Sequence, residues 1–375
     1  MIIPDFALEH FFVRWEFVAA HMLGSSDAET HSQADLLALA DEECRRWWDT
    51  LSLGYTEVQG HPRLRAAIAS FYETVTPDDV VVFAGAQEAI FAFMNVALGR
   101  RDHAIVVWPA YQGLYEVARA AGADVSLLPL RHEQLWQLTP EAVGALVRPA
   151  TRVIVVNYPH SPTGAHIDSA TFAQIVKIAR AGGAHLFSDE VYRYSERDDH
   201  DRLPAAVDVY ERGVSLGVMS KAFGLAGLRI GWIATRDRAL RDRLLSFKHY
   251  TTICNSAPAE VLATIALRAS HTILARNRAI ADANLQVLDA FFARWPDIFE
   301  WVRPHAGTTA FPRLLAPVPI DTFVEELAAS ESVLLVPGTV FGHPGNHFRI
   351  GFGRRDLPDA LSRLERFAQR RLRRG

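Results

Sequence analysis

The strongest constraint on the fold of this chain is an alternation of short apolar runs and helix-like stretches from residue 80 to residue 189. Most of the apolar runs are rich in valine and isoleucine, which is typical of buried strands, and the stretches between them have apolar residues at helical spacing. This alternation is characteristic of βαβ units and predicts a mainly parallel sheet covered by helices. The predicted strands are residues 80–84, 105–108, 125–129, 153–157 and 185–189, and the predicted helices are 89–98, a stretch ending at 121, 140–147 and 169–181.

A second constraint comes from residues 214–233, which read VSLGVMSKAFGLAGLRIGWI. An apolar run at 214–219 and another beginning at Arg229 indicate two strands joined by small residues. The connector is too short for the helical crossover that parallel neighbours need, so the second strand should be antiparallel to the first. Lys221 then lies at a strand end, where a desolvated amine can attack a carbonyl carbon, and Arg229 offers a rigid fork that suits a phosphate. Taken alone, a lysine beside a strand is far more often a solvated surface charge.

The composition excludes several classes of function. The chain has 39 Lys and Arg against 43 Asp and Glu, a net charge of −4, and its only basic cluster is the short tail Arg370, Arg371, Arg373 and Arg374. This distribution predicts no nucleic-acid partner and no binding to a membrane surface. At 375 residues the chain exceeds the usual size of one apolar core, which predicts two domains.

The cysteines and the N-terminus indicate a cytoplasmic protein. Cys44 and Cys254 have no partner cluster and no CxxC spacing, so we expect neither a disulfide framework nor a metal site. The first 17 residues are apolar but interrupted by charges, and they resemble an amphipathic segment more than a signal peptide. No apolar run approaches the length of a transmembrane helix.

The lysine stretch resembles the corresponding segment of the fold type I aminotransferases of class I/II, which depend on pyridoxal 5′-phosphate (PLP). In that family the lysine carries PLP as a Schiff base, which implies this role for Lys221 and phosphate contacts for Ser220 and Arg229. The family pair D-x-x-Y matches Asp189 and Tyr192. The resemblance implies that Asp189 keeps the pyridine nitrogen protonated, as the chemistry of PLP requires, and that Tyr192 bonds the 3′-oxygen.

Two further segments match the family in order. The turn Gly85-Ala86-Gln87 lies between a predicted strand and a helix, where free backbone N–H groups form an anion site, and the resemblance assigns it the PLP phosphate. Tyr111 follows the strand 105–108 and matches the aromatic residue that stacks on the pyridine ring. Without the resemblance, the turn could simply connect two elements and Tyr111 could be a core residue.

The loop NYPHSPTG at 157–164 resembles the family loop NPxNPTG, with one departure. Ser161 stands where the family carries an asparagine that bonds the 3′-oxygen of PLP. A serine can donate one hydrogen bond, but its reach is shorter. A second departure is Val218, at the position of a phosphate-binding serine three residues before the lysine.

Two motifs imply where the substrate and a second subunit bind. The pattern Y-x₄-G-x₃-LR begins at Tyr55, and in the family this tyrosine reaches the cofactor phosphate of the neighbouring subunit, so the resemblance implies a homodimer with shared sites. In HFRIGFG, Arg349 matches the arginine that grips the substrate α-carboxylate in a bidentate way. Gly24 and Ser26 are implied as further substrate-binding residues.

The resemblance extends from about Gly24 to the C-terminus and implies an α/β fold of the PLP-dependent transferase type I. A large domain with a mostly parallel mixed sheet between helices is expected at 49–272. A small α+β domain is expected from both termini, with 1–48 and 273–375 contributing. The remaining predicted elements are helices at 34–48, from Pro62, and at 236–247, 256–269, 273–295, 321–329 and 358–370, with strands at 300–303, 308–313 and 333–336.

The implied function is an aminotransferase that moves an amino group between an amino acid and a 2-oxo acid. The same fold also hosts lyases, decarboxylases and cyclases such as capreomycidine synthase, so another PLP reaction on an amino acid stays open. A non-catalytic module that binds an amino acid or PLP as an effector also stays open.

Overall fold

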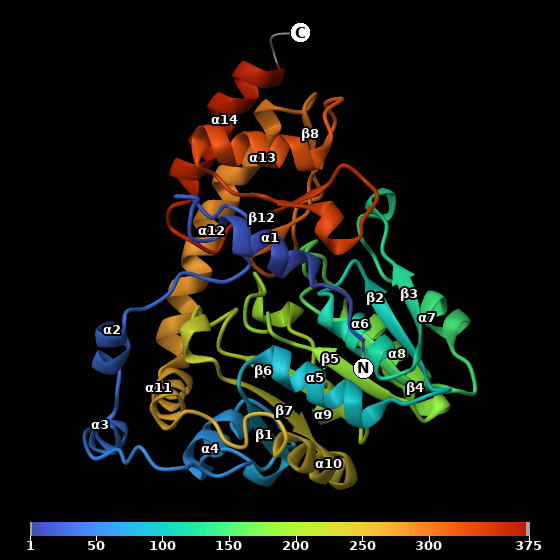
Figure 1. Ribbon diagram of the computed structural model, residues 1–375, viewed down its shortest axis with the longest axis vertical. Helices are drawn as coiled ribbons and strands as arrows, with labels where there is room; N and C mark the ends of the chain where they lie inside the picture. The colour runs from blue at the N-terminus through green and yellow to red at the C-terminus, as the bar shows by residue number, and fades with distance from the viewer. Residues whose placement is uncertain (1, 373–375) are drawn as a thin grey trace.

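The computed structural model describes residues 2–372. Its largest element is a seven-stranded sheet with the strand order β1-β7-β6-β5-β4-β2-β3 (Figure 1). Strand β7 is antiparallel to both of its neighbours, β1 and β6, and all the other neighbouring strands are parallel. The predicted parallel sheet with an antiparallel strand after Lys221 is confirmed. The strands are β1 Val80–Phe83, β2 His103–Trp108, β3 Asp124–Pro129, β4 Thr151–Asn157, β5 His185–Asp189, β6 Gly213–Val218 and β7 Gly231–Thr235.

Helices cover both faces of this sheet, and successive strand residues point to opposite faces. In β2, Val106 belongs to the apolar core on one face and Ile105 to the core on the other. Both side chains are fully buried, which explains why the strands read as uninterrupted apolar runs. The first face is covered by α5 (Ala86–Ala97), α6 (Gly113–Ala120) and α10 (Arg238–Lys248), and the second by α7 (Pro140–Leu146) and α8 (Ser169–Gly182), with α4 (Pro62–Ala69) and α11 (Ala257–Arg268) packed near β1 and β7.

The region 34–48 forms two helices, so the prediction of one continuous helix is wrong. Helix α2 covers Gln33–Ala38 and helix α3 covers Glu42–Asp49. The break occurs because Asp41 caps α3: its carboxylate accepts the backbone N–H of Cys44 at 2.7 Å. The apolar spacing continues across the break, which is why periodicity did not reveal it.

A second part of the molecule lies above the large sheet in Figure 1, and the 25-residue helix α12, Ser270–Arg294, connects the two parts. Its strands are short, and the predicted strand at 308–313 is in fact two strands, β9 and β10. Pro312 lies between them and has no N–H to donate to a strand ladder. The elements here are β8 Phe299–Glu300, β9 Thr309–Ala310, β10 Arg313–Leu314, α13 Ile320–Glu331, β11 Val336–Pro337, β12 Phe348–Gly351 and α14 Leu357–Leu372.

The N-terminal residues contact both parts. Helix α1, Ala7–Trp15, lies beside the C-terminal elements, and His21 forms a bridge with Val333. Helices α2 and α3 instead pack on α11, and Leu36 and Cys44 share a core with strand β1. The predicted domain division at residues 48 and 272 stays a prediction, and these contacts favour placing its first boundary before Gln33.

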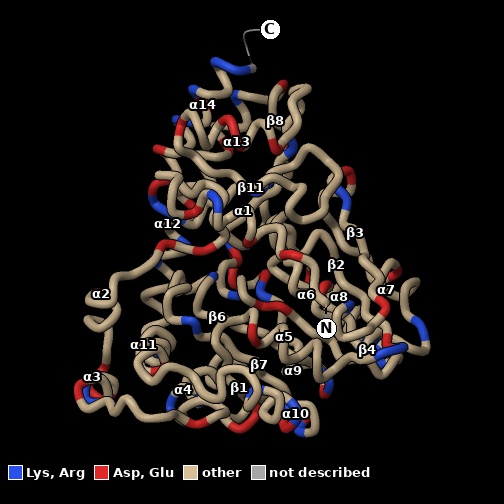
Figure 2. Tube along the Cα trace, in the orientation of Figure 1, with Lys and Arg blue, Asp and Glu red and all other residues tan. Residues whose placement is uncertain are grey.

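Acidic and basic residues are interspersed along the trace (Figure 2). Within residues 2–372, no helix has the length and hydropathy needed to cross a membrane. In the same part of the chain, no group of three or more His, Cys, Asp or Glu could hold a metal ion, and Cys44 and Cys254 are free thiols. Arg373 and Arg374 of the basic tail lie outside the described residues.

Candidate functional site

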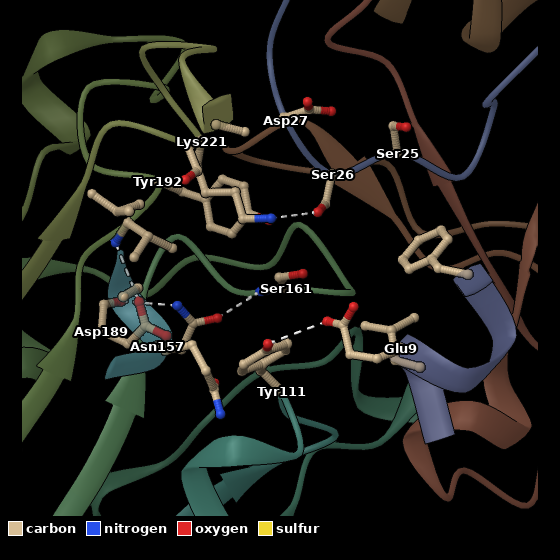
Figure 3. Close-up of a pocket in the computed structure, with 18 of the residues that line it drawn as sticks. Glu9, Ser25, Ser26, Asp27, Tyr111, Asn157, Ser161, Asp189, Tyr192 and Lys221 are labelled. Atoms are coloured by element: carbon tan, nitrogen blue, oxygen red, sulfur yellow. Dashed lines mark hydrogen bonds between the residues drawn. The ribbon is translucent and has the colours of Figure 1, made fainter. Parts of the chain in front are cut away.

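A cavity of about 430 Å³ opens at the carboxyl ends of the parallel strands, where open α/β sheets usually bind ligands (Figure 3). Strands β4, β5 and β6 end at its floor. Helix α1, the segment after it and the chain around β12 close it from the other side. The lining residues include most of the predicted ones: Ser26, Ala86, Gln87, Tyr111, Ser161, Asp189, Tyr192, Ser220, Lys221, Arg229 and Arg349.

The predicted lysine lies at the centre of this cavity. The Nζ atom of Lys221 donates a hydrogen bond to the Oγ atom of Ser26 at 2.8 Å (Figure 3). Ser26 is itself buried, and its backbone carbonyl accepts a hydrogen bond from Thr308 at 3.0 Å. The backbone N–H of Ala28 donates to the carbonyl of Lys221 at 3.2 Å. The N-terminal segment is therefore tied both to the lysine side chain and to its backbone.

Asp189 is the last residue of β5, and only 5% of it is exposed. Its backbone carbonyl accepts a hydrogen bond from the side chain of Asn157 at 2.9 Å, and its carboxylate accepts the N–H of Val191 at 3.3 Å. Burial raises the pKa of Asp189 to about 7, although the Val191 hydrogen bond and the charge of Lys221 oppose the shift. A buried carboxylate with so few donors is costly unless a cation or an N–H group pairs with it.

The turn from β1 into α5 approaches Arg229 closely. Gly85 has a φ of 89°, and a Cβ atom on it would lie 2.6 Å from the Nη2 atom of Arg229. Helix α5 begins at Ala86, three residues earlier than predicted, so its free N–H groups lie beside the cavity. Gln87, in the first turn, also lines the cavity and has a buried Oε1 atom without a hydrogen-bond partner among the described residues. Gly85 itself does not line the cavity. Because it has no side chain, the turn can lie close to the guanidinium of Arg229.

Two tyrosines stand on opposite sides of the cavity (Figure 3). The hydroxyl of Tyr111 donates to a carboxylate oxygen of Glu9 at 3.3 Å, and its ring lies 4.9 Å from that of Phe6. Burial raises the pKa of Tyr111 above its usual value. Tyr192 is buried and also faces the cavity. Both tyrosines are thus available to a ligand.

Arg349 is the most deeply buried cation of the cavity, with 3% of the residue exposed. Its Nε atom donates to the carbonyl oxygen of Gly24 at 2.9 Å, and its guanidinium lies within 6 Å of the rings of Phe12 and Phe341. Burial lowers the pKa of Arg349. Within residues 2–372 it forms no ion pair with a carboxylate, so this buried cation calls for an anionic ligand. Gly24 does not line the cavity, and its predicted role in substrate binding stays a prediction.

Asn157 is a residue that the sequence reasoning missed. Its side-chain oxygen accepts the backbone N–H of Ser161 at 2.9 Å while its amide nitrogen bonds Asp189. It therefore holds the loop 157–164 against the end of β5, with Ser161 facing the cavity. Its position at the end of a predicted strand, as first residue of that loop, was the available signal. The charged lining residues that the sequence reasoning also missed are Glu9, Glu16, Asp27 and Arg354.

Tyr55 lies outside this cavity and is 93% exposed. It lines a separate depression with Trp47, His61 and Glu260. Its predicted contact with the cofactor of a neighbouring subunit stays a prediction.

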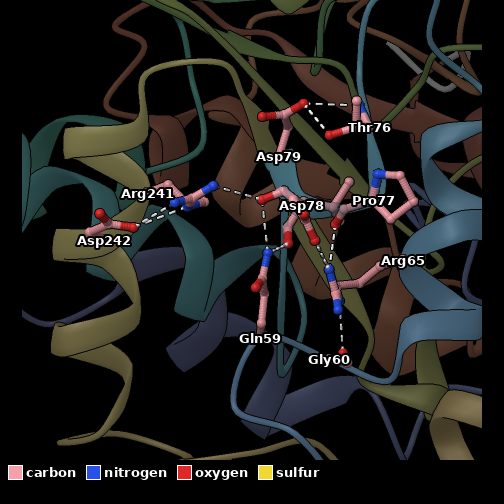
Figure 4. A network of polar contacts seen from close by, with 10 residues as sticks. Gln59, Gly60, Arg65, Thr76, Pro77, Asp78, Asp79, Arg241 and Asp242 are labelled. Carbon is pink, nitrogen blue, oxygen red and sulfur yellow. Dashed lines mark hydrogen bonds and ion pairs between the residues drawn. The ribbon is translucent and has the colours of Figure 1, made fainter.

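The chain just after Tyr55 is fixed by a polar network (Figure 4). Arg65 donates to the carbonyls of Gly60 at 3.0 Å and Pro77 at 2.7 Å, and Gln59 donates to the carbonyl of Asp78 at 2.9 Å. Asp78 lies just before β1, so the network links the loop after Tyr55 to the strand that precedes the Gly85 turn. The exposed tyrosine thus projects from an anchored loop.

Known proteins resemble this chain in sequence and in fold. The family described as aminotransferase class I and II matches residues 24–364. The capreomycidine synthase of Streptomyces vinaceus is 30% identical over 351 residues, which is 93% of this chain and 90% of that protein. An aspartate aminotransferase of Pyrococcus horikoshii is 27% identical, with 87% of this chain and 85% of that protein covered. A PLP-dependent aminotransferase structure from Streptococcus suis has a TM-score of 0.93 and 30% identity, with 99% of both chains covered.

The residues of the cavity fit PLP. Asp189 is a buried carboxylate without a cationic partner, suited to a protonated ring nitrogen. The start of α5 and Arg229 are suited to a phosphate, and Lys221 presents an amine to the carbonyl group. The match to the family and the fit of the cavity lead to one conclusion: the chain belongs to the aminotransferase class I and II family and is a PLP-dependent enzyme of fold type I.

Proposed function

We propose that this enzyme is an aminotransferase that moves the α-amino group of an amino acid to a 2-oxo acid, with PLP attached covalently to Lys221. The observation that carries the proposal is the meeting of an amine, a buried carboxylate and a buried guanidinium in one cavity, from Lys221, Asp189 and Arg349. The reaction needs these three groups for proton transfer, for the ring nitrogen and for the substrate carboxylate.

PLP, when bound, supplies an electron sink that withdraws charge from the Cα atom of the substrate. In the proposal Asp189 accepts the N–H of the pyridine ring, Tyr192 and Ser161 bond its 3′-oxygen, and Tyr111 stacks on the ring. Burial supports the role of Asp189, because water competes little for its carboxylate.

The phosphate is proposed to lie at the start of α5. The backbone N–H groups of Ala86 and Gln87, the hydroxyl of Ser220 and the guanidinium of Arg229 supply donors there. Val218 occupies the place where the resemblance led us to expect a further serine, and it lines the cavity as an apolar residue. Arg229 and the helix N-terminus therefore provide more of the phosphate binding.

Lys221 is proposed to act as the general base and acid. Once the substrate amine has replaced Lys221 on the cofactor, the freed lysine amine would accept the proton of the substrate Cα atom and return a proton during the transfer. The hydroxyl of Ser26, at 2.8 Å from Nζ, is placed to orient the amine. Arg349 holds the substrate α-carboxylate, and the carbonyl of Gly24 fixes the orientation of its guanidinium.

A second candidate function is a PLP-dependent cyclisation or elimination on an amino acid. The similarity to capreomycidine synthase over 93% of the chain favours it. The same residues would serve, because this reaction also begins with loss of the Cα proton. The two candidates differ in the product: transamination replaces the α-amine by a keto group, whereas cyclisation keeps the nitrogen.

The test is a panel of amino acids and 2-oxo acids with the PLP-loaded enzyme, followed by absorbance of the bound cofactor and by product mass. Formation of a 2-oxo acid together with a new amino acid supports transamination. A product that retains its α-nitrogen supports the second candidate. If amino acids change the absorbance but no product forms from any of them, the protein is an effector-binding module and both proposals are wrong.

A further inference from the structure

The cavity is lined by more charged residues than the proposed function assigns a role to. Asp189, Lys221 and Arg229 are assigned to PLP, and Arg349 is assigned to the α-carboxylate of the substrate. The remaining charged lining residues are Glu9, Glu16, Asp27 and Arg354. They are three carboxylates and one guanidinium, so these remaining residues carry a net negative charge.

Asp27 and Arg354 neutralise each other. The Nη2 and Nε atoms of Arg354 lie 2.9 Å and 3.2 Å from the two carboxylate oxygens of Asp27, which is a bidentate pair. Glu9 and Glu16 are left. Within residues 2–372, neither forms an ion pair with a lysine or arginine, and the hydrogen bond that Glu9 accepts comes from the neutral hydroxyl of Tyr111.

Both glutamates come from helix α1. Glu9 lies in its first turn and Glu16 is its C-cap, and the carboxylate of Glu9 points toward the middle of the cavity (Figure 3). The pKa of Glu16 is raised by partial burial and by the charges of Glu9 and Asp27, while Arg354 opposes the shift. The carboxylates therefore repel one another, and a cation bound among them would relieve that repulsion.

The cavity thus presents charges of both signs. Arg349 is a buried cation that calls for a carboxylate, and the glutamates of α1 are anions on the same cavity. We propose that Glu9 and Glu16 bind a cationic group at the end of the substrate side chain, so that the substrate is a basic amino acid with a guanidinium or an ammonium group. The inference rests on the proposed function, because it assumes that Arg349 holds the α-carboxylate.

The size of the effect follows from the exposure of the two glutamates. Both are exposed to water, so each contributes less than a buried ion pair would. A charge-assisted hydrogen bond that the bound substrate covers from water contributes more. Loss of one such contact corresponds to about a 10- to 100-fold decrease in the affinity for the substrate. Two carboxylates present four acceptor oxygens, which suit the five N–H donors of a guanidinium better than the three of an ammonium.

The first experiment compares L-arginine with L-citrulline on the PLP-loaded enzyme. The two side chains have the same length, and only the first is charged. We expect kcat/KM to be at least about tenfold higher for L-arginine, and L-ornithine to show whether an ammonium is also accepted. Glu16→Gln and Glu9→Gln should each lower kcat/KM for L-arginine by a larger factor than for L-citrulline, and so reduce this preference. Glu325→Gln is the matched control. Glu325 is an exposed carboxylate of α13 that pairs with Arg14 of helix α1, and it does not line the cavity.

A second experiment measures binding without turnover. 5-Guanidinopentanoate has the carboxylate and the guanidinium but no α-amine, and hexanoate has the carboxylate alone. We expect calorimetry on the PLP-loaded enzyme to show tighter binding of 5-guanidinopentanoate than of hexanoate. Glu16→Gln should reduce the ratio of the two affinities about tenfold. Glu16 accepts no hydrogen bond in the described structure, so this variant should fold normally even if Glu9→Gln does not.

The two experiments separate the inference from the proposed function. If amino acids with neutral or acidic side chains are the better substrates, the inference is wrong and transamination stands. Selective, glutamate-dependent binding of 5-guanidinopentanoate without turnover of any amino acid would support the inference and refute the proposed function. Equal binding of the two acids by the wild-type enzyme would also overturn the inference.

Discussion

The deep end of the cavity and its mouth differ in the elements that supply their side chains and in how far those side chains are buried. At the deep end Asp189 is the last residue of β5, and Lys221 follows shortly after the end of the adjacent parallel strand β6. At the mouth Glu9 and Glu16 come from a helix near the N-terminus and are exposed. The sheet therefore fixes the reacting groups, whereas a peripheral helix presents the groups that would choose the substrate.

This difference explains how one fold can host several reactions on several amino acids. A change at a strand end alters a residue whose environment is low in water and whose partners are fixed, so it should affect the chemistry strongly. A change on α1 should alter selectivity and leave the chemistry intact. The predictions below test that contrast in order of expected effect.

The largest effect is expected for Lys221→Ala, which should abolish covalent attachment of PLP and reduce turnover to background. The chain has only three lysines, Lys177, Lys221 and Lys248, so borohydride fixation followed by peptide mapping gives a clear answer. Lys177→Ala is the matched control, because Lys177 is exposed on α8. Lys248 is fully buried and donates to the carbonyls of Val58 and Val82. A cofactor label on Lys248 would contradict the assignment.

The next effect is expected for Asp189→Asn. A neutral amide occupies the same space but cannot stabilise a protonated pyridine ring, so turnover should fall roughly a thousandfold while PLP binding weakens far less. Steady-state kinetics and a PLP titration measure the two quantities separately. Near-normal kcat would show that the buried carboxylate does not serve the ring nitrogen.

Asp189→Asn should lower activity, but it should increase the stability of the PLP-free protein at alkaline pH. Burial raises the pKa of Asp189 to about 7, above its value in an unfolded chain, so the folded state holds this proton more tightly. The contribution to stability is complete below about pH 4 and is lost as the pH rises through 7. At pH 8, Asp189→Asn should therefore be more stable than the wild type, by up to about 4 kcal/mol. Urea unfolding of both PLP-free proteins at pH 5 and pH 8 measures this difference in the free energy of unfolding. If the difference does not grow with pH, the pKa of Asp189 is not raised in the folded state.

Tyr55 tests whether the site is complete within one chain. We propose a homodimer in which this exposed tyrosine contacts the phosphate bound by the neighbouring subunit. In a mixture of inactive Lys221→Ala and weakened Tyr55→Phe subunits, each heterodimer should regain one site of native composition, so activity should rise above that of either variant alone. Tyr250→Phe is a control at another exposed tyrosine. Full activity of a monomer in sedimentation would rule the proposal out.

The deep end could be predicted from the sequence far better than the mouth. Lys221 and Asp189 follow apolar runs of strand length, and the carboxyl ends of parallel strands meet at one edge of a sheet. Arg349 was found only through its motif, since its strand of four residues gives little periodic signal. Glu9 and Glu16 were missed because their helix reads as an amphipathic surface segment. Only the tertiary packing of α1 brings it close to Lys221 and to the strand ends, which are distant from it in the sequence.

The smallest effect is expected at Ser161, which lies between the two ends. Its backbone is fixed by Asn157 through a hydrogen bond of 2.9 Å, so the position of its side chain is set while its reach stays short. In the proposal Tyr192 is then the main donor to the 3′-oxygen of PLP. A lost hydrogen bond to a charged group corresponds to about one to two pKa units.

Ser161→Asn should therefore shift the midpoint of the visible-absorbance titration of bound PLP downward by about one unit, if the longer side chain reaches the oxygen. Tyr192→Phe should shift it upward by more, and Ser161→Ala should change it little. The backbone bond to Asn157 is kept in both Ser161 variants, so the loop should stay in place. A strong shift in Ser161→Ala with none in Tyr192→Phe would mean that the serine, and not the tyrosine, is the principal donor. The loop 157–164 would then belong with the sheet-fixed deep end and not with the adjustable mouth.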